Sequence, residues 1–222
     1  MSKFEGDQIA PGPLRARFGF TLPGALAWRE LVDKLEAGNV DPHLAFDDFM
    51  QSLPVLLTLP PPPRCCVFVS YQRRDLSLAL KLAKLVTLQG YDYWLDAHDP
   101  MLSYVVGGSP IGSPRREILI AAIIEIALLS STHVIATHTA NSKRSRWIPY
   151  ELGRAKQRSV VSQQTAGWFE PGLTPASCGE YTYLAVETRS RADVVNWLNP
   201  SGPRLCSTGA KKWVRDDPGD LP

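Results

Sequence analysis

Hydrophobic residues recur along the chain with two different periods, and these predict an alternation of strands and helices. Short apolar runs at Cys66–Ser70, Tyr91–Leu95 and His133–Thr137 are typical of buried strands, and we expect further strands at Ser159–Ser162 and Tyr181–Val186. Helices are expected between them, from Asp75, from Ser113-Pro114 and over 145–156, and a last helix from Ser190. Strands separated by single helices favour a parallel sheet covered by helices on both faces, an α/β flavodoxin-like fold.

The region before this alternating pattern has a helical period only. Trp28, Leu31, Val32 and Leu35 form one apolar stripe that Gly38 ends, and Asp41-Pro42 is a cap for a second helix carrying Phe46, Phe49, Met50 and Leu53. Two such helices cannot form a core alone, so we expect them to pack on the main domain or on a partner subunit.

Proline and glycine mark the borders of the predicted parts. Pro60–Pro63 reads as a stiff spacer, and the chain from Pro200 onward is rich in Gly, Pro and charge. We therefore expect a helical N-terminal extension with its Pro-rich linker at 1–63, the α/β domain at 64–199 and a flexible tail at 200–222. The Gly/Pro/Ser-rich stretch 96–113 is expected to be a long loop that covers a ligand as a lid.

Composition excludes several classes of protein. The net charge is +2, from 24 basic and 22 acidic residues, and no nucleic-acid motif is present, so nucleic-acid binding is not expected. The four cysteines lack zinc-finger or CxxC spacing, the first residues lack a signal-peptide pattern, and the apolar run 118–129 is too short to span a bilayer. These observations predict a cytoplasmic globular protein without membrane contact. We expect the apolar run to be a helix packed against the sheet or another protomer.

Three segments combine into a recognisable pattern. Phe68-Val69-Ser70-Tyr71 with Asp75, then Tyr93-Trp94-Leu95-Asp96, and finally the run from Ser145 to Ala155, in which Glu151 follows Trp147 by four residues, occur in this order. Together they resemble the three conserved boxes of a TIR (Toll/interleukin-1 receptor) domain, over roughly residues 64–198. The resemblance is to the bacterial, NAD⁺-cleaving members of the family, which include the Thoeris type of antiphage protein.

That resemblance implies an NAD⁺ glycohydrolase or ADP-ribosyl cyclase, with Glu151 as the catalytic residue. Loss of nicotinamide from NAD⁺ expels a neutral pyridine from a cation, so one carboxylate that stabilises an oxocarbenium-like ribose suffices. The plainer alternative is that Glu151 pairs with Arg154 on a helix surface.

The other candidate site residues are expected to bind NAD⁺ as substrate. Trp147 would line the pocket or pack in the core, and Tyr71 would stack on a base or fill the strand end. Arg73 or Arg74 would contact the pyrophosphate, or both would be solvated loop charges. Asp96 would order its loop, touch a ribose or accept from a backbone amide.

The remaining polar groups give weaker indications of a functional site. Asp96, His98 and Asp99 lack the ligand number and spacing of a metal site, so neither a metal nor a bound cofactor is expected. His133 and His138 flank a strand without a partner motif and are expected to be structural. The Lys143, Arg144 and Arg146 cluster would steer an anionic dinucleotide or be a solvated face.

Partners follow from the same resemblance. We expect self-association through TIR–TIR contacts and a separate effector that responds to a nucleotide product. The alternatives are a non-catalytic TIR adaptor, which would act through assembly alone, and a secreted effector that mimics host TIR domains.

Overall fold

The structure is a computed structural model that describes residues 22–57, 66–108, 110–158, 164–199 and 221. The predicted Pro60–Pro63 spacer and the predicted strand Ser159–Ser162 lie outside these residues, as does most of the predicted tail. Within the described ranges, no helix is long and apolar enough to cross a membrane.

A five-stranded, all-parallel sheet is the centre of the α/β part. Its strands are β1 (Cys66–Ser70), β2 (Asp92–Trp94), β3 (His133–His138), β4 (Thr165–Phe169) and β5 (Val186–Thr188), in the spatial order β2-β1-β3-β4-β5. This 2-1-3-4-5 order is that of flavodoxin-like folds, in which ligands bind beyond the carboxyl ends of the strands. The predicted α/β fold is therefore confirmed.

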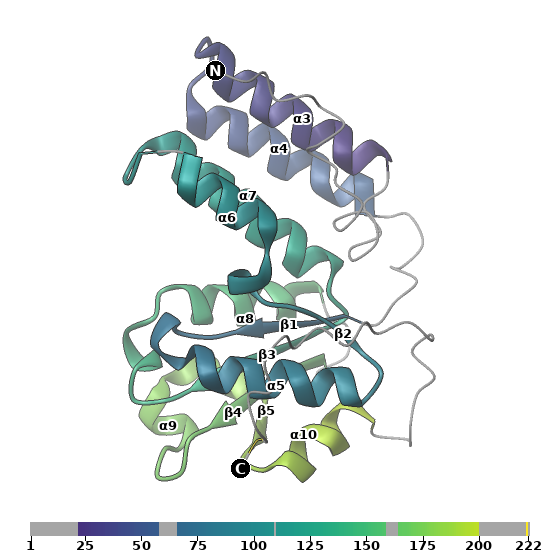
Figure 1. The fold of residues 1–222 in the computed structure, drawn as a ribbon, viewed down its shortest axis with the longest axis vertical. Helices are drawn as coiled ribbons and strands as arrows, with labels where there is room; N and C mark the ends of the chain where they lie inside the picture. The colour runs from purple at the N-terminus through teal and green to yellow at the C-terminus, as the bar shows by residue number, and fades with distance from the viewer. Residues whose placement is uncertain (1–21, 58–65, 109, 159–163, 200–220, 222) are drawn as a thin grey trace. The chain divides into compact units, whose positions relative to one another are not determined.

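Helices cover both faces of the sheet. On one face, α5 (Leu76–Leu88) and α10 (Arg191–Leu198) share a hydrophobic core with side chains of β1, β3 and β4 such as Val69, Ile135 and Trp168. On the other face, α8 (Trp147–Arg158) packs on β3 and β4. Figure 1 shows α5 and α8 on opposite sides of the strands.

The chain divides into two compact units. One boundary between them follows Pro63, and two more lie at the ends of 99–130. The sheet unit contains 64–98 and 131–222, whereas 99–130, the crossover between β2 and β3, joins residues 1–63 in a helical unit. That unit contains α3 (Leu22–Ala37), α4 (Pro42–Leu57), α6 (Pro100–Gly108) and α7 (Pro114–Ser130).

The N-terminal helices thus find partners within their own chain. α4 packs on both α3 and α7, and α7 in turn packs on α6. Trp28 of α3 meets Phe49 of α4 edge to face, with 6.5 Å between ring centroids, and Arg115 of α7 forms an ion pair with Glu36 of α3 at 2.7 Å. The apolar helix at 118–129 supplies the surface that these two helices lack.

Local capping signals predicted several helix ends correctly. Asp41 Oδ1 accepts from the backbone N–H groups of His43 and Leu44 at the start of α4, and Gly38, which follows α3, has φ 66°. Ser190 and Asp193 form a reciprocal capping box at the start of α10.

Three predictions about local structure are wrong. The expected loop 96–113 contains α6, whose start is capped by Asp99, and much of the expected strand Tyr181–Val186 is a 3-10 helix (η5, Glu180–Leu184) followed by β5. Strand β4 was missed. Its sequence, Thr-Ala-Gly-Trp-Phe, is buried on both faces and so has no alternating pattern for sequence analysis to detect.

Candidate functional site

The candidate site lies at the carboxyl ends of β1 and β2, where three connecting segments meet. Ser70 is the last residue of β1, and its hydroxyl donates a hydrogen bond to the Glu151 carboxylate from the first turns of α8. This contact joins residues 81 positions apart in the sequence. The connection from β3 to α8 therefore brings Glu151 to the carboxyl end of β1.

Glu151 is a buried carboxyl group, with 6% of its surface exposed. Burial raises the pKa of Glu151 to about 7; the Ser70 hydrogen bond lowers it in part, and the nearby negative charge of Asp96 raises it. The partner of the carboxylate is Ser70 rather than Arg154, so the helix-surface pairing is not what the structure contains. A buried carboxyl group that titrates near neutral pH is typical of functional sites.

Tyr71 and Asp96 form a second pair beside the first. The Tyr71 hydroxyl donates to Asp96 Oδ1, linking the residue after β1 to the residue two positions after β2. Burial and this hydrogen bond raise the pKa of Tyr71, which keeps the phenol protonated as a donor. The structure thus shows Asp96 as the acceptor of a side-chain hydroxyl, which links the residues that follow β1 and β2.

A buried network fixes the loop that precedes α8. The Asp75 carboxylate accepts from Thr139 Oγ1 and from Asn141 Nδ2, both at 2.6 Å. Asp75 precedes α5 as predicted, but its side chain makes no cap hydrogen bond to that helix. It instead ties the β1–α5 loop to the β3–α8 loop, and so holds Ser70 and Glu151 on one scaffold.

The remaining predicted residues lie on the surface of the same unit. Arg73 and Arg74 are exposed in the 3-10 turn after Tyr71, where Gln72 Oε1 accepts from the Arg74 backbone N–H at 2.6 Å. Trp147 is 43% exposed and meets Tyr150 edge to face, with centroids 5.8 Å apart. Core packing of Trp147 is therefore excluded. The basic side chains of Lys143, Arg144 and Arg146 are also exposed.

No metal cluster forms from the residues that were considered for one. His98 Nδ1 lies 3.0 Å from the Tyr93 hydroxyl, and Asp99 caps α6. Among the described residues, no group of three or more His, Cys, Asp or Glu side chains is placed to hold a metal ion.

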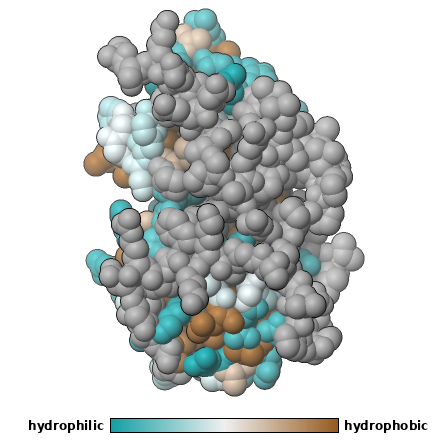
Figure 2. Space-filling view, turned by 45° about the vertical axis from the view of Figure 1, so that its right-hand side comes forward, coloured by the Kyte–Doolittle hydropathy of each residue, from teal (hydrophilic) through white to brown (hydrophobic). Residues whose placement is uncertain are grey.

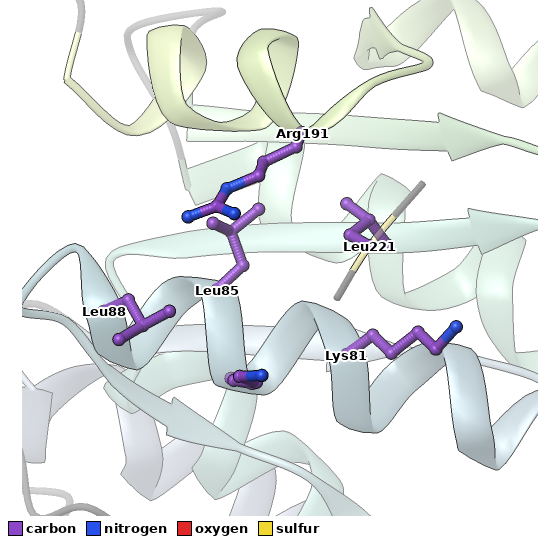
Figure 3. Close-up of a pocket in the computed structure, with 6 residues that line it drawn as sticks. Lys81, Leu85, Leu88, Arg191 and Leu221 are labelled. Carbon is purple, nitrogen blue, oxygen red and sulfur yellow. The ribbon is translucent and has the colours of Figure 1, made fainter. Parts of the chain in front are cut away.

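A small hollow elsewhere in the sheet unit contains none of these residues. Figure 3 shows Lys81, Leu85 and Leu88 around it, with Arg191 of α10 and Leu221. Its volume, which includes open solvent, is about 180 Å³. Ligand pockets are larger, at roughly 300–1,000 Å³. On the surface in Figure 2, apolar residues form a brown patch bordered by polar teal ones in the lower part of the view.

Sequence analysis missed Ser70 as a site residue. The available signal was its position, because a hydroxyl residue that ends a buried central strand lies where ligands bind in such sheets. Its pairing with Glu151 could not be inferred, since that contact depends on how α8 lies on the sheet.

Comparisons with known proteins add nothing to this geometry: no family model matches the chain, and neither the curated proteins nor the solved structures give a significant match.

Proposed function

We propose that this chain is a TIR-domain enzyme that cleaves the nicotinamide–ribose bond of NAD⁺, with Glu151 as its catalytic carboxylate. The observation that carries the proposal is the buried Glu151 hydrogen-bonded to Ser70 at the carboxyl end of the sheet. The TIR-like sequence boxes support it, because Tyr71 and Asp96 from the first two boxes pair beside the Glu151 of the third.

The chemistry needs one ionised carboxylate in a site with little water. As the ribose C1′–N bond breaks, its electron pair goes to the pyridine nitrogen and neutral nicotinamide leaves. Positive charge develops on the ribose, and a preorganised carboxylate stabilises it strongly in a buried site. Water, or a nucleophilic atom of the bound ADP-ribose, then adds to C1′ and loses a proton, which gives hydrolysis or cyclisation.

The raised pKa of Glu151 fits a cationic substrate. An empty site holds the carboxyl group partly protonated at pH 7, since its pKa is about 7. A pyridinium cation next to the carboxylate favours the ionised form and lowers that pKa. Substrate binding would therefore release the proton and create the charge that the reaction needs.

The surrounding residues have roles consistent with a dinucleotide. Arg73 and Arg74 are exposed next to the site, where either guanidinium can contact pyrophosphate oxygens. Trp147, one turn before Glu151, offers an exposed ring to a base or to the pyridine. Asp96, held by Tyr71, is close enough to Glu151 to influence its charge.

The biological role in this proposal is production of a signalling nucleotide in bacterial antiphage immunity, in the cytoplasm, with a separate effector that responds to the product. NAD⁺ is the substrate, and self-association through TIR–TIR contacts would assemble the active form.

The decisive experiment is an assay of free nicotinamide after mixing purified protein with NAD⁺ at low and high protein concentration. Glu151→Gln should abolish release, whereas Glu180→Gln, at an exposed glutamate of the same unit, should leave it unchanged. Mass spectrometry of the second product separates ADP-ribose from a cyclic product. Activity that persists in Glu151→Gln contradicts the assigned role.

One observation favours a non-catalytic adaptor as the second candidate. Trp147, Tyr150 and Tyr183 are 43%, 44% and 69% exposed, and exposed aromatic side chains are typical of protein interfaces. If the adaptor is correct, Trp147→Ala with Tyr150→Ala should reduce the mass of the assembly in light scattering, and no nicotinamide should appear at any protein concentration.

A further inference from the structure

His138 is a buried histidine whose ring nitrogens have no hydrogen-bond partner in the described part of the chain. It is the last residue of β3, and its relative exposure is 0%. Neither Nδ1 nor Nε2 has a hydrogen-bond partner among the residues that the structure describes. Leaving a buried polar group unpaired is unfavourable, because the group loses its hydrogen bonds to water, so such a group in a folded protein calls for an explanation.

The other histidine of the same strand shows the contrast. His133 Nδ1 lies 2.9 Å from Thr132 Oγ1, and its ring meets Tyr91 and Trp197 edge to face at 5.4 Å. His133 thus has a polar partner and aromatic neighbours, which fits the structural role expected for it. The ring nitrogens of His138, in contrast, have no hydrogen-bond partner among the described residues.

The His138 ring itself fills a narrow slot between Phe169, Tyr181 and Gly167. Phe169 stacks on the imidazole with centroids 4.5 Å apart and 25° between the planes, and Tyr181 lies at 5.9 Å. A Cβ at Gly167 would lie 2.8 Å from both Cδ2 and Nε2 of His138, which is too close for any other residue without a shift of the ring. Gly167 therefore makes room for the imidazole edge that carries Nε2.

His138 lies on the same face of the sheet as the Ser70–Glu151 pair. Ser70 is in register with Ala136, and side chains two residues apart on a strand point to the same face. Two steps of about 3.3 Å along β3 and one strand spacing of about 4.8 Å place the Cα atoms of Ser70 and His138 roughly 8 Å apart.

We propose that His138 is a substrate-binding residue that hydrogen-bonds the carboxamide of the nicotinamide ring. This assignment rests on the proposed function of the site as an NAD⁺-cleaving centre. A carboxamide has one acceptor oxygen and a donor NH₂ group, and a neutral imidazole has one donor and one acceptor nitrogen, so either tautomer makes a bond. The ligand would thereby pair with one of the two ring nitrogens that lack a hydrogen-bond partner among the described residues, and Nδ1 is the one whose edge does not face Gly167.

The charge of the imidazole also fits this substrate. Burial lowers the pKa of His138 to about 4, so the ring is neutral at pH 7. A neutral ring does not repel the pyridinium cation, as a protonated histidine would.

The test compares His138→Leu and His138→Gln with the wild type, and uses Thr137→Val as the matched control. Leu has nearly the volume of His without its nitrogens, and Gln restores a donor and an acceptor. Thr137 is the neighbouring residue on the opposite face, and its buried Oγ1 also lacks a partner in the described part of the chain. Thr137→Val therefore removes a comparable unpaired atom away from the site.

We expect His138→Leu to lower kcat/KM for NAD⁺ about tenfold, which is the loss of one hydrogen bond of about 1.4 kcal/mol. Most of the change should be in KM. His138→Gln should recover part of the loss and Thr137→Val should cause none, and thermal unfolding should show that His138→Leu is not less stable. The His138→Leu effect should be absent for the NAD⁺ analogue whose pyridine ring carries no carboxamide. Wild-type kinetics in His138→Leu, or an equal loss with both dinucleotides, would overturn the assignment.

A second measurement separates this inference from the proposed reaction. NMR signals of the ¹⁵N-labelled His138 ring are followed while NAD⁺ or ADP-ribose, which lacks the pyridine, is added to Glu151→Gln. A shift with NAD⁺ and none with ADP-ribose supports the contact, even if the wild type releases no nicotinamide and the proposed reaction fails. No shift with either ligand overturns the contact, even if the wild type is active.

Discussion

The burial of Glu151 has a consequence for stability that can be measured without any substrate. Its pKa is about 7 in the folded chain, against 4.5 for an unperturbed glutamate. Between these two values the unfolded chain releases the proton that the folded chain keeps. Because the unfolded state then binds fewer protons, the free energy of unfolding falls as pH rises through this window.

The size of the effect follows from the pKa difference. Each unit of difference corresponds to about 1.4 kcal/mol, so the wild type should lose about 3 kcal/mol of stability between pH 4.5 and pH 8 through this group, and little further above it. Glu151→Gln removes the titrating group but keeps a similar shape. The stability of Glu151→Gln relative to the wild type should therefore increase by about 3 kcal/mol from pH 4.5 to pH 8.

Urea denaturation followed by tryptophan fluorescence at pH 4.5, 5.5, 6.5 and 8 measures this difference. Glu180→Gln is the control, since it makes the same substitution at an exposed glutamate of the same unit. A Glu151→Gln curve that runs parallel to the wild type over the whole range would show that the carboxyl group titrates as in water. The electrostatic reasoning about the site would then be refuted.

Three further outcomes are expected. Ser70→Ala removes the hydrogen bond that lowers the pKa of Glu151, so the acidic limb of the pH profile of kcat/KM for NAD⁺ should move upward by about one pH unit. This size follows because a hydrogen bond to a charged group contributes about 1.5–3 kcal/mol. An unmoved limb would mean that another group sets it. Asp96→Asn removes a negative charge that raises the same pKa, so the limb should move to lower pH, while Asn still offers Tyr71 an acceptor oxygen. Gly167→Ala places a methyl group 2.8 Å from the His138 ring, which should cost about 1–3 kcal/mol in urea denaturation and raise KM for NAD⁺; an unchanged KM would count against the slot.

Local sequence determined the features that depend on near neighbours. Helix starts at Asp41-Pro42 and Ser190, and the stop at Gly38, were predicted correctly because a cap or a left-handed turn involves residues within four positions. The buried strands β1 and β3 were predicted from their apolar runs, and the parallel fold followed from the helices between them. Glu151, Tyr71 and Asp96 were selected from the sequence pattern alone.

Tertiary structure decided what those residues face. The sequence contains no signal that Ser70 is the partner of Glu151, that 99–130 joins the N-terminal helices, or that the buried ring of His138 lacks a hydrogen-bond partner among the described residues. Each depends on contacts between segments far apart in the chain, and burial, pKa and unpaired atoms arise only when those segments pack. The sequence therefore supplies the residue types of the candidate site. The packing of α8 on the sheet sets the geometry of these residues and their charge states.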